Sequence, residues 1–229
     1  MTRMTGNNNK TYFRPPILPS RAMRPIPKSS RAHFVGETTF WRDGCWQVLG
    51  FGSLLEYRAA ILAFAQPNFH DLEEQIGPIA LRLPNGKTKK HFLDYRLTTI
   101  YGQRIGLSVK PYRRATRSDF KAEMKALRHA GTPAFFDRLC VVTERNQDPV
   151  RLANAHLFHD AREAEPDLDA DVLAELLRGP RTVCISEAVR RSDYGGRSFF
   201  PIVRNIRAGN LSVPPRARIG GETMLEVAA

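Results

Sequence analysis

Apolar and polar positions change period as the chain proceeds, and the changes mark out its elements. Residues 39–50, TFWRDGCWQVLG, contain two short β-type runs on either side of Asp43 and Gly44, which predicts a hairpin. After Ser53 the apolar side chains recur at helical spacing, and Pro67 ends that pattern. Ser53 is therefore expected to cap a helix that reaches residue 64.

Strand and helix patterns continue to alternate up to about residue 149. A turn at Asn85-Gly86 follows an extended segment, and a second hairpin has its loop near Tyr101-Gly102-Gln103. The predicted segments are a strand at 69–83, the hairpin at 91–110, a helix at 117–130 closed by Gly131, and a strand at 135–143. This alternation favours an α/β fold, a sheet with helices on its faces.

The pattern becomes mainly helical beyond Pro149. Helices are expected at 150–162, 169–178, 184–191 and 200–208, followed by a turn at 209–210 and two short β-type segments. Several helices followed by a small hairpin are typical of a winged helix-turn-helix. We therefore divide the chain into residues 1–36, 37–160 and a small C-terminal winged-helix-like domain, 161–229.

Residues 1–36 form a basic segment that is rich in proline. It holds seven Lys or Arg side chains and no acidic one, and its prolines interrupt any helix. Such a composition predicts an extended arm that is flexible when free. Two interpretations stay open: a solvated tail with no task, or an arm that lies along DNA phosphates.

The net charge of the chain limits the classes of molecule that it is expected to bind. The chain of 229 residues has a formal net charge of +12 and a pI near 10.1, which favours nucleic acid as a partner. An anionic membrane surface would also suit this charge, but no basic amphipathic helix supports it. No apolar run is long enough to span a bilayer, and the N-terminus lacks the apolar region of a signal peptide. Three widely spaced cysteines suggest a reducing, cytoplasmic environment.

The second hairpin carries the candidate chemistry. Strand alternation allows Asp94 and Lys110 to point out of the apolar sheet at its end, and Glu56 lies on the preceding helix. Carboxylates can hold Mg²⁺, and a lysine can stabilise a scissile phosphate or its attacking water. Simpler interpretations remain: Asp94 pairs with Arg96 or Lys110, Glu56 only caps its helix, and Lys110 is solvated.

Several short motifs, in order, resemble those of TnsA-like endonuclease subunits of heteromeric transposases, which belong to the restriction-endonuclease-like superfamily. The matching segments are Phe51-Gly-Ser-Leu-Leu-Glu-Tyr-Arg58, Gln75 with Pro78 nearby, Phe92-Leu-Asp-Tyr95, Val109-Lys-Pro111, Val141-Val-Thr-Glu144 and Asn154. The resemblance covers roughly residues 30–160. It implies a restriction-endonuclease-like mixed sheet flanked by helices.

The resemblance also implies a set of site residues. Glu56 and Asp94 would bind Mg²⁺ or Mn²⁺, and Lys110 would be the catalytic lysine, with Gln75 in support. The Val109 backbone carbonyl would be a further metal ligand. The family has an acidic or amide residue two positions before the lysine, where this chain has Ser108, a neutral hydroxyl and a weaker ligand.

The implied function is metal-dependent nicking of the non-joined strand at transposon ends. The partners would be DNA, a DDE-type transposase and an AAA+ ATPase regulator. Two alternatives remain: a catalytically degenerate DNA-binding assembly subunit, and a stand-alone restriction or junction-resolving nuclease. The basic side chains expected to contact DNA are Arg14, Arg21, Arg24, Lys28, Arg31, Lys89, Lys90, Arg113 and Arg114.

The histidines are weaker candidates. His91 precedes Asp94 by three residues, which places it on the other face of a regular strand. His156 and His159 have a helical spacing that could suit a metal, but a packed or solvated pair is the favoured interpretation.

Overall fold

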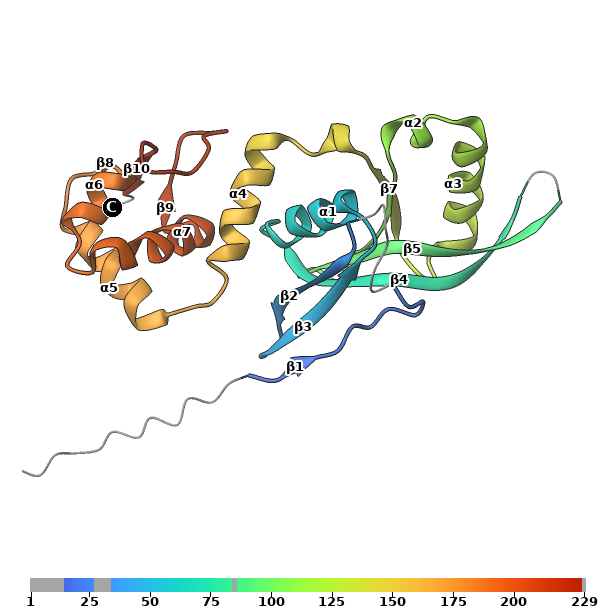
Figure 1. Cartoon of the computed structure of the whole chain (residues 1–229), viewed down its shortest axis with the longest axis horizontal. Coiled ribbons are helices and arrows are strands. Elements are labelled where there is room, and N and C mark those ends of the chain that lie inside the picture. The colour runs from blue at the N-terminus through green and yellow to red at the C-terminus, as the bar shows by residue number, and fades with distance from the viewer. Residues whose placement is uncertain (1–14, 27–33, 84–85, 228–229) are drawn as a thin grey trace, which may run out of the picture.

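The computed structural model describes residues 15–26, 34–83 and 86–227. It is a mixed α/β structure, as the sequence predicted, with helices flanking its sheets (Figure 1). The largest sheet has the order β4-β5-β6-β7. Its strands are β4 (Phe69–Arg82), β5 (Thr88–Thr99), β6 (Arg104–Val109) and β7 (Arg138–Val142). The first three are antiparallel, whereas β7 runs parallel to β6 after a helical crossover.

Helix α1 (Leu54–Phe64) begins where the sequence predicted, because the Ser53 hydroxyl accepts a hydrogen bond from the Glu56 backbone N–H at 3.1 Å. Apolar residues of α1 join Tyr95, Leu107 and other sheet residues in one buried core. Helix α3 (Ser118–Gly131) packs against β4 and forms a second core with it. A short helix, α2 (Tyr112–Ala115), precedes α3.

A smaller sheet packs beside this main unit. The predicted hairpin is present as β2 (Gly36–Arg42) and β3 (Cys45–Phe51), which turn at residues 43–44. A third strand, β1 (Ile17–Leu18), pairs in parallel with β3. Residues 15–26 of the expected arm therefore run along the folded unit (Figure 1). Residues 1–14 and 27–33 lie outside the described residues.

The C-terminal unit has its own core and a three-stranded antiparallel sheet of order β8-β10-β9. Its elements in chain order are α5 (Pro166–Leu177), β8 (Thr182–Cys184), α6 (Ile185–Arg191), α7 (Phe199–Ala208), β9 (Leu211–Ser212) and β10 (Met224–Val227). The four predicted helices of this region are confirmed, including α4 (Pro149–Asp160). Strands β1 and β8 and helix α2 were not predicted, because each is too short to show a period.

Helix α4 links the two units, and Figure 1 shows it standing between them. Ala155 is buried in the core of the first unit. The Asn154 amide donates to the Ala217 carbonyl and accepts from the Ile219 backbone N–H, both at 2.9 Å. Arg207 of α7 donates to the Phe64 carbonyl of α1, also at 2.9 Å. Among the described residues, no helix is long and apolar enough to cross a membrane.

Candidate active site

Asp94 lies on β5 at the point where the neighbouring strand β6 ends. Its side chain is 8% exposed, so it is more buried than the alternating pattern suggested. Its Oδ2 accepts a hydrogen bond of 2.7 Å from the Val109 backbone N–H. The strand end therefore holds this carboxylate in a fixed position.

Lys110 meets Asp94, as the sequence allowed. Its ammonium group lies 3.1 Å from Asp94 Oδ2 and 3.4 Å from Oδ1, and it donates to the Val109 carbonyl at 2.9 Å. The Lys110 backbone N–H bonds to the Val142 carbonyl at 2.9 Å, which anchors the residue to β7. Of the two simpler pairings expected for Asp94, the one with Lys110 is confirmed, and the one with Arg96 is wrong, because Arg96 binds Glu73 instead, at 2.7 Å.

Glu56 combines a capping role with a place beside this pair. Its Oε2 accepts from the Gly52 backbone N–H at 2.8 Å, and its Oε1 accepts from the Ser53 hydroxyl at 3.1 Å. Burial raises the pKa of Glu56 and the nearby Asp94 charge raises it further, whereas the hydrogen bonds from Gly52 and Ser53 and, more weakly, the Lys110 charge oppose the shift. Glu56 therefore interacts electrostatically with both Asp94 and Lys110.

A cavity of about 220 Å³ opens beside Asp94 and Lys110. Its walls carry five cationic side chains and two acidic ones. The lining residues are Arg24, Lys89, Lys90, His91, Phe92, Asp94, Lys110, Arg114, Phe120 and Glu123. Such a cavity suits a polyanion that approaches a small acidic centre.

Residues of the N-terminal segment contribute to this cavity. Arg24 donates to the Gln75 side-chain carbonyl at 2.6 Å, and its guanidinium lies 5.1 Å from the centre of the Phe92 ring. Gln75 is buried, with a φ of 51°, a strained backbone conformation for a residue other than glycine. A register shift between β4 and β5 comes directly after this residue, between Ile76 and Ile79. The hydrogen bond from Arg24 to Gln75 helps to hold Arg24 at the wall of the cavity.

His91 and Asp94 both line this cavity, which also takes in the consecutive residues Lys89, Lys90 and Phe92 of β5. The same register shift, between Ile76 and Ile79, lies opposite this part of β5 and places the extra residue in β4. His91 Nδ1 lies 2.9 Å from Glu123 of α3. Sequence reasoning missed Glu123, which has no motif and comes from an element far away in sequence.

Whether a metal ion could bind at this site depends on the oxygen atoms around Lys110. Among the described residues, no three His, Cys, Asp or Glu side chains are grouped so as to hold a metal ion. The Lys110 ammonium does bridge Asp94 Oδ2 and the Val109 carbonyl, two oxygens suited to a hard cation. Asp94, the Val109 carbonyl and Glu56 are the groups here that could hold a metal, and the ammonium now lies between the first two. Ser108 is fully buried, and its hydroxyl has no hydrogen-bond partner among the described residues.

The residues expected to contact DNA have different surroundings. Arg24, Lys89, Lys90 and Arg114 line the cavity, and Arg113 is exposed on α2. Arg21 instead forms a two-pronged ion pair with Asp71, at 2.7 and 2.9 Å. Arg14, Lys28 and Arg31 lie outside the described residues.

The other two histidines of interest are packed side chains. His159 bonds to the Thr38 hydroxyl at 3.0 Å and stacks on Phe64. Burial, assisted by the Arg162 charge, lowers the pKa of His159 to about 4. His156 instead packs near the Tyr57 ring. The packed interpretation of this pair is therefore confirmed.

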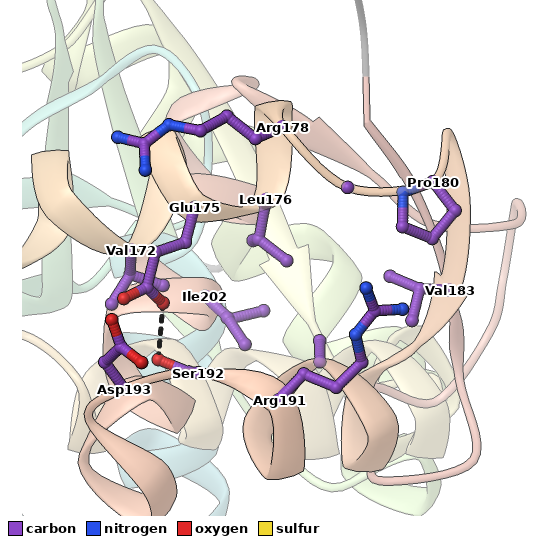
Figure 2. Close-up of a pocket in the computed structure, with 12 residues that line it drawn as sticks. Val172, Glu175, Leu176, Arg178, Pro180, Val183, Arg191, Ser192, Asp193 and Ile202 are labelled. Atoms are coloured by element: carbon purple, nitrogen blue, oxygen red, sulfur yellow. Dashed lines mark hydrogen bonds between the residues drawn. The ribbon is translucent and has the colours of Figure 1, made fainter.

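A separate cavity of about 270 Å³ lies in the C-terminal unit (Figure 2). Val172, Leu176 and Ile202 form its apolar wall, and Glu175 accepts a 2.6 Å hydrogen bond from Ser192. It contains no histidine, lysine or cysteine. Asp94 and Lys110, which the sequence singled out, line the other cavity.

Comparisons with known proteins leave the family open. A scan against protein-family models gives no match to the chain, and a search of curated proteins gives no significant match. Function is therefore inferred from the geometry of this site and from the order of the motifs in the sequence.

Proposed function

We propose that this chain is a Mg²⁺- or Mn²⁺-dependent DNA endonuclease that nicks the non-joined strand at transposon ends. The observation that carries the proposal is the cavity that joins a half-buried Asp94–Lys110 pair to a rim of arginine and lysine side chains. The arginine and lysine side chains of the rim could bind DNA phosphates, and the Asp94 and Glu56 carboxylates could bind a cation that stabilises the phosphate being cut.

Each side chain has a distinct role in the proposed reaction. A bound divalent ion would supply charge stabilisation at the phosphate that is cut. Asp94, the Val109 carbonyl and Glu56 would hold it, and Gln75 would keep Arg24 in place beside the site. Lys110, once released from Asp94, would position the attacking water or stabilise the phosphate oxygens. Arg24, Lys90 and Arg114 would bind the flanking phosphates.

The architecture supports a restriction-endonuclease-like assignment of the first unit. Its mixed sheet follows α1 and is completed by β7 after the α3 crossover. The order of elements in the C-terminal unit supports a winged-helix-like domain. Arg204 of α7 pairs with Asp169, and Arg207 bonds to the main unit. Because these arginines are engaged internally, we favour docking of the ATPase regulator over groove binding by α7, with a DDE-type transposase as the other protein partner.

The second candidate is a DNA-binding assembly subunit that does not cut. Both oxygens of Glu56 and both oxygens of Asp94 already accept hydrogen bonds within the chain, and Ser108 offers no accessible ligand. A third possibility, a stand-alone restriction or junction-resolving nuclease, would require neither transposase nor ATPase.

A cleavage assay separates these candidates. Transposon-end DNA is incubated with Mg²⁺ or Mn²⁺, with and without the partner proteins, and wild type is compared with Asp94→Ala and Lys110→Ala. Lys125→Ala is the control, because this exposed lysine of α3 lines a different cavity. Nicking that both site variants abolish supports the proposal. Equal cutting by the site variants would refute the site, binding without cutting would favour the assembly subunit, and cutting without partners would favour the stand-alone enzyme.

A further inference from the structure

His91 is a buried histidine in the wall of the proposed site. It is 9% exposed and lines the cavity that also contains Asp94 and Lys110. Its Nε2 is buried and has no hydrogen-bond partner among the described residues. A buried polar nitrogen normally bonds to protein or to water. The cavity beside it, of about 220 Å³, is large enough for several water molecules.

Glu123 fixes the orientation of this imidazole ring. Its Oε1 lies 2.9 Å from His91 Nδ1 and accepts a 2.7 Å hydrogen bond from Lys89. Burial alone would raise the pKa of Glu123, but the hydrogen bonds from Lys89 and His91 outweigh it and lower that pKa. An ionised Glu123 accepts only, so Nδ1 must carry the hydrogen and Nε2 the free lone pair.

Burial favours the neutral form of this ring. It lowers the pKa of His91, although Glu123 and, more weakly, Asp94 oppose the shift, and Lys110 adds to it. Among the described residues that line this cavity, His91 alone offers a neutral nitrogen with a lone pair. The lysines and arginines are donors, and Asp94 is held by Lys110.

We propose that the Glu123–His91 pair is the general base of the site, with His91 Nε2 taking a proton from the attacking water. The inference rests on the proposed nuclease function and adds a residue to it. As the water O–H bond breaks, its electron pair forms the new O–P bond, and its proton passes to Nε2. The bond from phosphorus to the 3′-oxygen then breaks, and the leaving oxygen takes a proton from solvent. Glu123 stabilises the imidazolium that forms.

The test compares His91→Ala and Glu123→Gln with wild type and with His129→Ala, an exposed histidine on the same helix as Glu123. Single-turnover nicking should fall ~10²–10⁴-fold in His91→Ala, and ~10–100-fold in Glu123→Gln, which still holds the ring but loses the charge. His129→Ala should nick at the wild-type rate. DNA binding and thermal melting identify any variant that fails to fold.

Chemical rescue separates a base from a structural side chain. Added imidazole should restore part of the activity of His91→Ala and none of that of Asp94→Ala. If His91→Ala nicked DNA at the wild-type rate while Asp94→Ala was inactive, this inference would be overturned and the proposed function would stand. A loss in His91→Ala that imidazole does not restore, in a folded variant that binds DNA, would also overturn the role of base. Absence of nicking by wild type in either metal would overturn both proposals together.

Discussion

Replacing Lys110 with alanine is the sharpest test of how the acidic centre is held. The Asp94 side chain is 8% exposed and that of Lys110 is 34% exposed, so the pair is half sheltered from water. After Lys110→Ala, the backbone N–H of Val109 would be the main remaining partner of a buried carboxylate. The charge of Asp94 would no longer be balanced by the cation it now contacts.

The expected cost follows from this partial burial. Removing one partner of a fully buried ion pair costs about 3–5 kcal/mol, whereas exposed pairs contribute about 0–1 kcal/mol. The intermediate exposure of Lys110 places the loss of unfolding free energy between these limits, at about 2 kcal/mol. For a chain of this length that corresponds to a decrease in Tm of about 4–8 °C.

A divalent metal should reverse much of this loss, because it would take the position that the ammonium leaves. A ligand present at 100 times its Kd stabilises the folded state by about 2.7 kcal/mol. The assay is thermal melting of wild type and Lys110→Ala, each with EDTA and with Mn²⁺. The metal should raise the Tm of Lys110→Ala clearly more than that of wild type. The double variant Asp94→Asn/Lys110→Ala should lose this gain, and Lys125→Ala should behave as wild type.

Two results would refute the reasoning. If Lys110→Ala melted at the wild-type temperature in EDTA, the ion pair would not stabilise the fold as its geometry indicates. If Mn²⁺ raised the Tm of the single and double variants equally, the metal would bind away from Asp94.

Three other predictions test the fold, its pH response and the cavity rim. Gly131→Ala should destabilise the chain by about 1 kcal/mol, because its new Cβ would lie 2.4 Å from the buried Phe136 ring. Gly196→Ala, which has open space around it, should melt like wild type, and equal Tm values for the two variants would contradict the close packing. The folded-state pKa of His159 is about 4, against an ordinary 6.5, so neutral His159 stabilises the folded state and this stabilisation should be lost as the pH falls from about 6.5 to 4. The Tm of His159→Gln should therefore depend less on pH than that of wild type, and parallel pH profiles would contradict this. Lys90→Ala should lower the slope of log K for DNA against log salt by about 0.9, with Lys125→Ala unchanged; an unchanged slope for both would remove the cavity rim from the DNA contact surface.

Local features of the fold were readable from the sequence because neighbouring residues generate them. The Ser53 cap, the turn at residues 43–44 and the helical periods each depend on a few consecutive positions, and the structure confirms them. The meeting of Asp94 and Lys110 was also predictable, because a hairpin brings its two arms together.

The surroundings of the candidate site could not be predicted in this way. The docking of residues 15–26 depends on contacts of Arg21 and Arg24 with residues about fifty positions away. His91 meets Glu123 of α3 at the wall of the cavity, and no period in the sequence brings these two residues together.

Most of the elements, the basic charge and the pair of residues joined by one hairpin could thus be predicted from short stretches of sequence. The burial of Asp94, the Lys110 bridge to the Val109 carbonyl and the orientation of His91 by Glu123 became visible only in the folded chain. The difference lies in how far along the chain the interacting residues are. Caps, turns and hairpins are set by short stretches of chain, whereas burial and the partners of a charged side chain depend on the packing of distant elements.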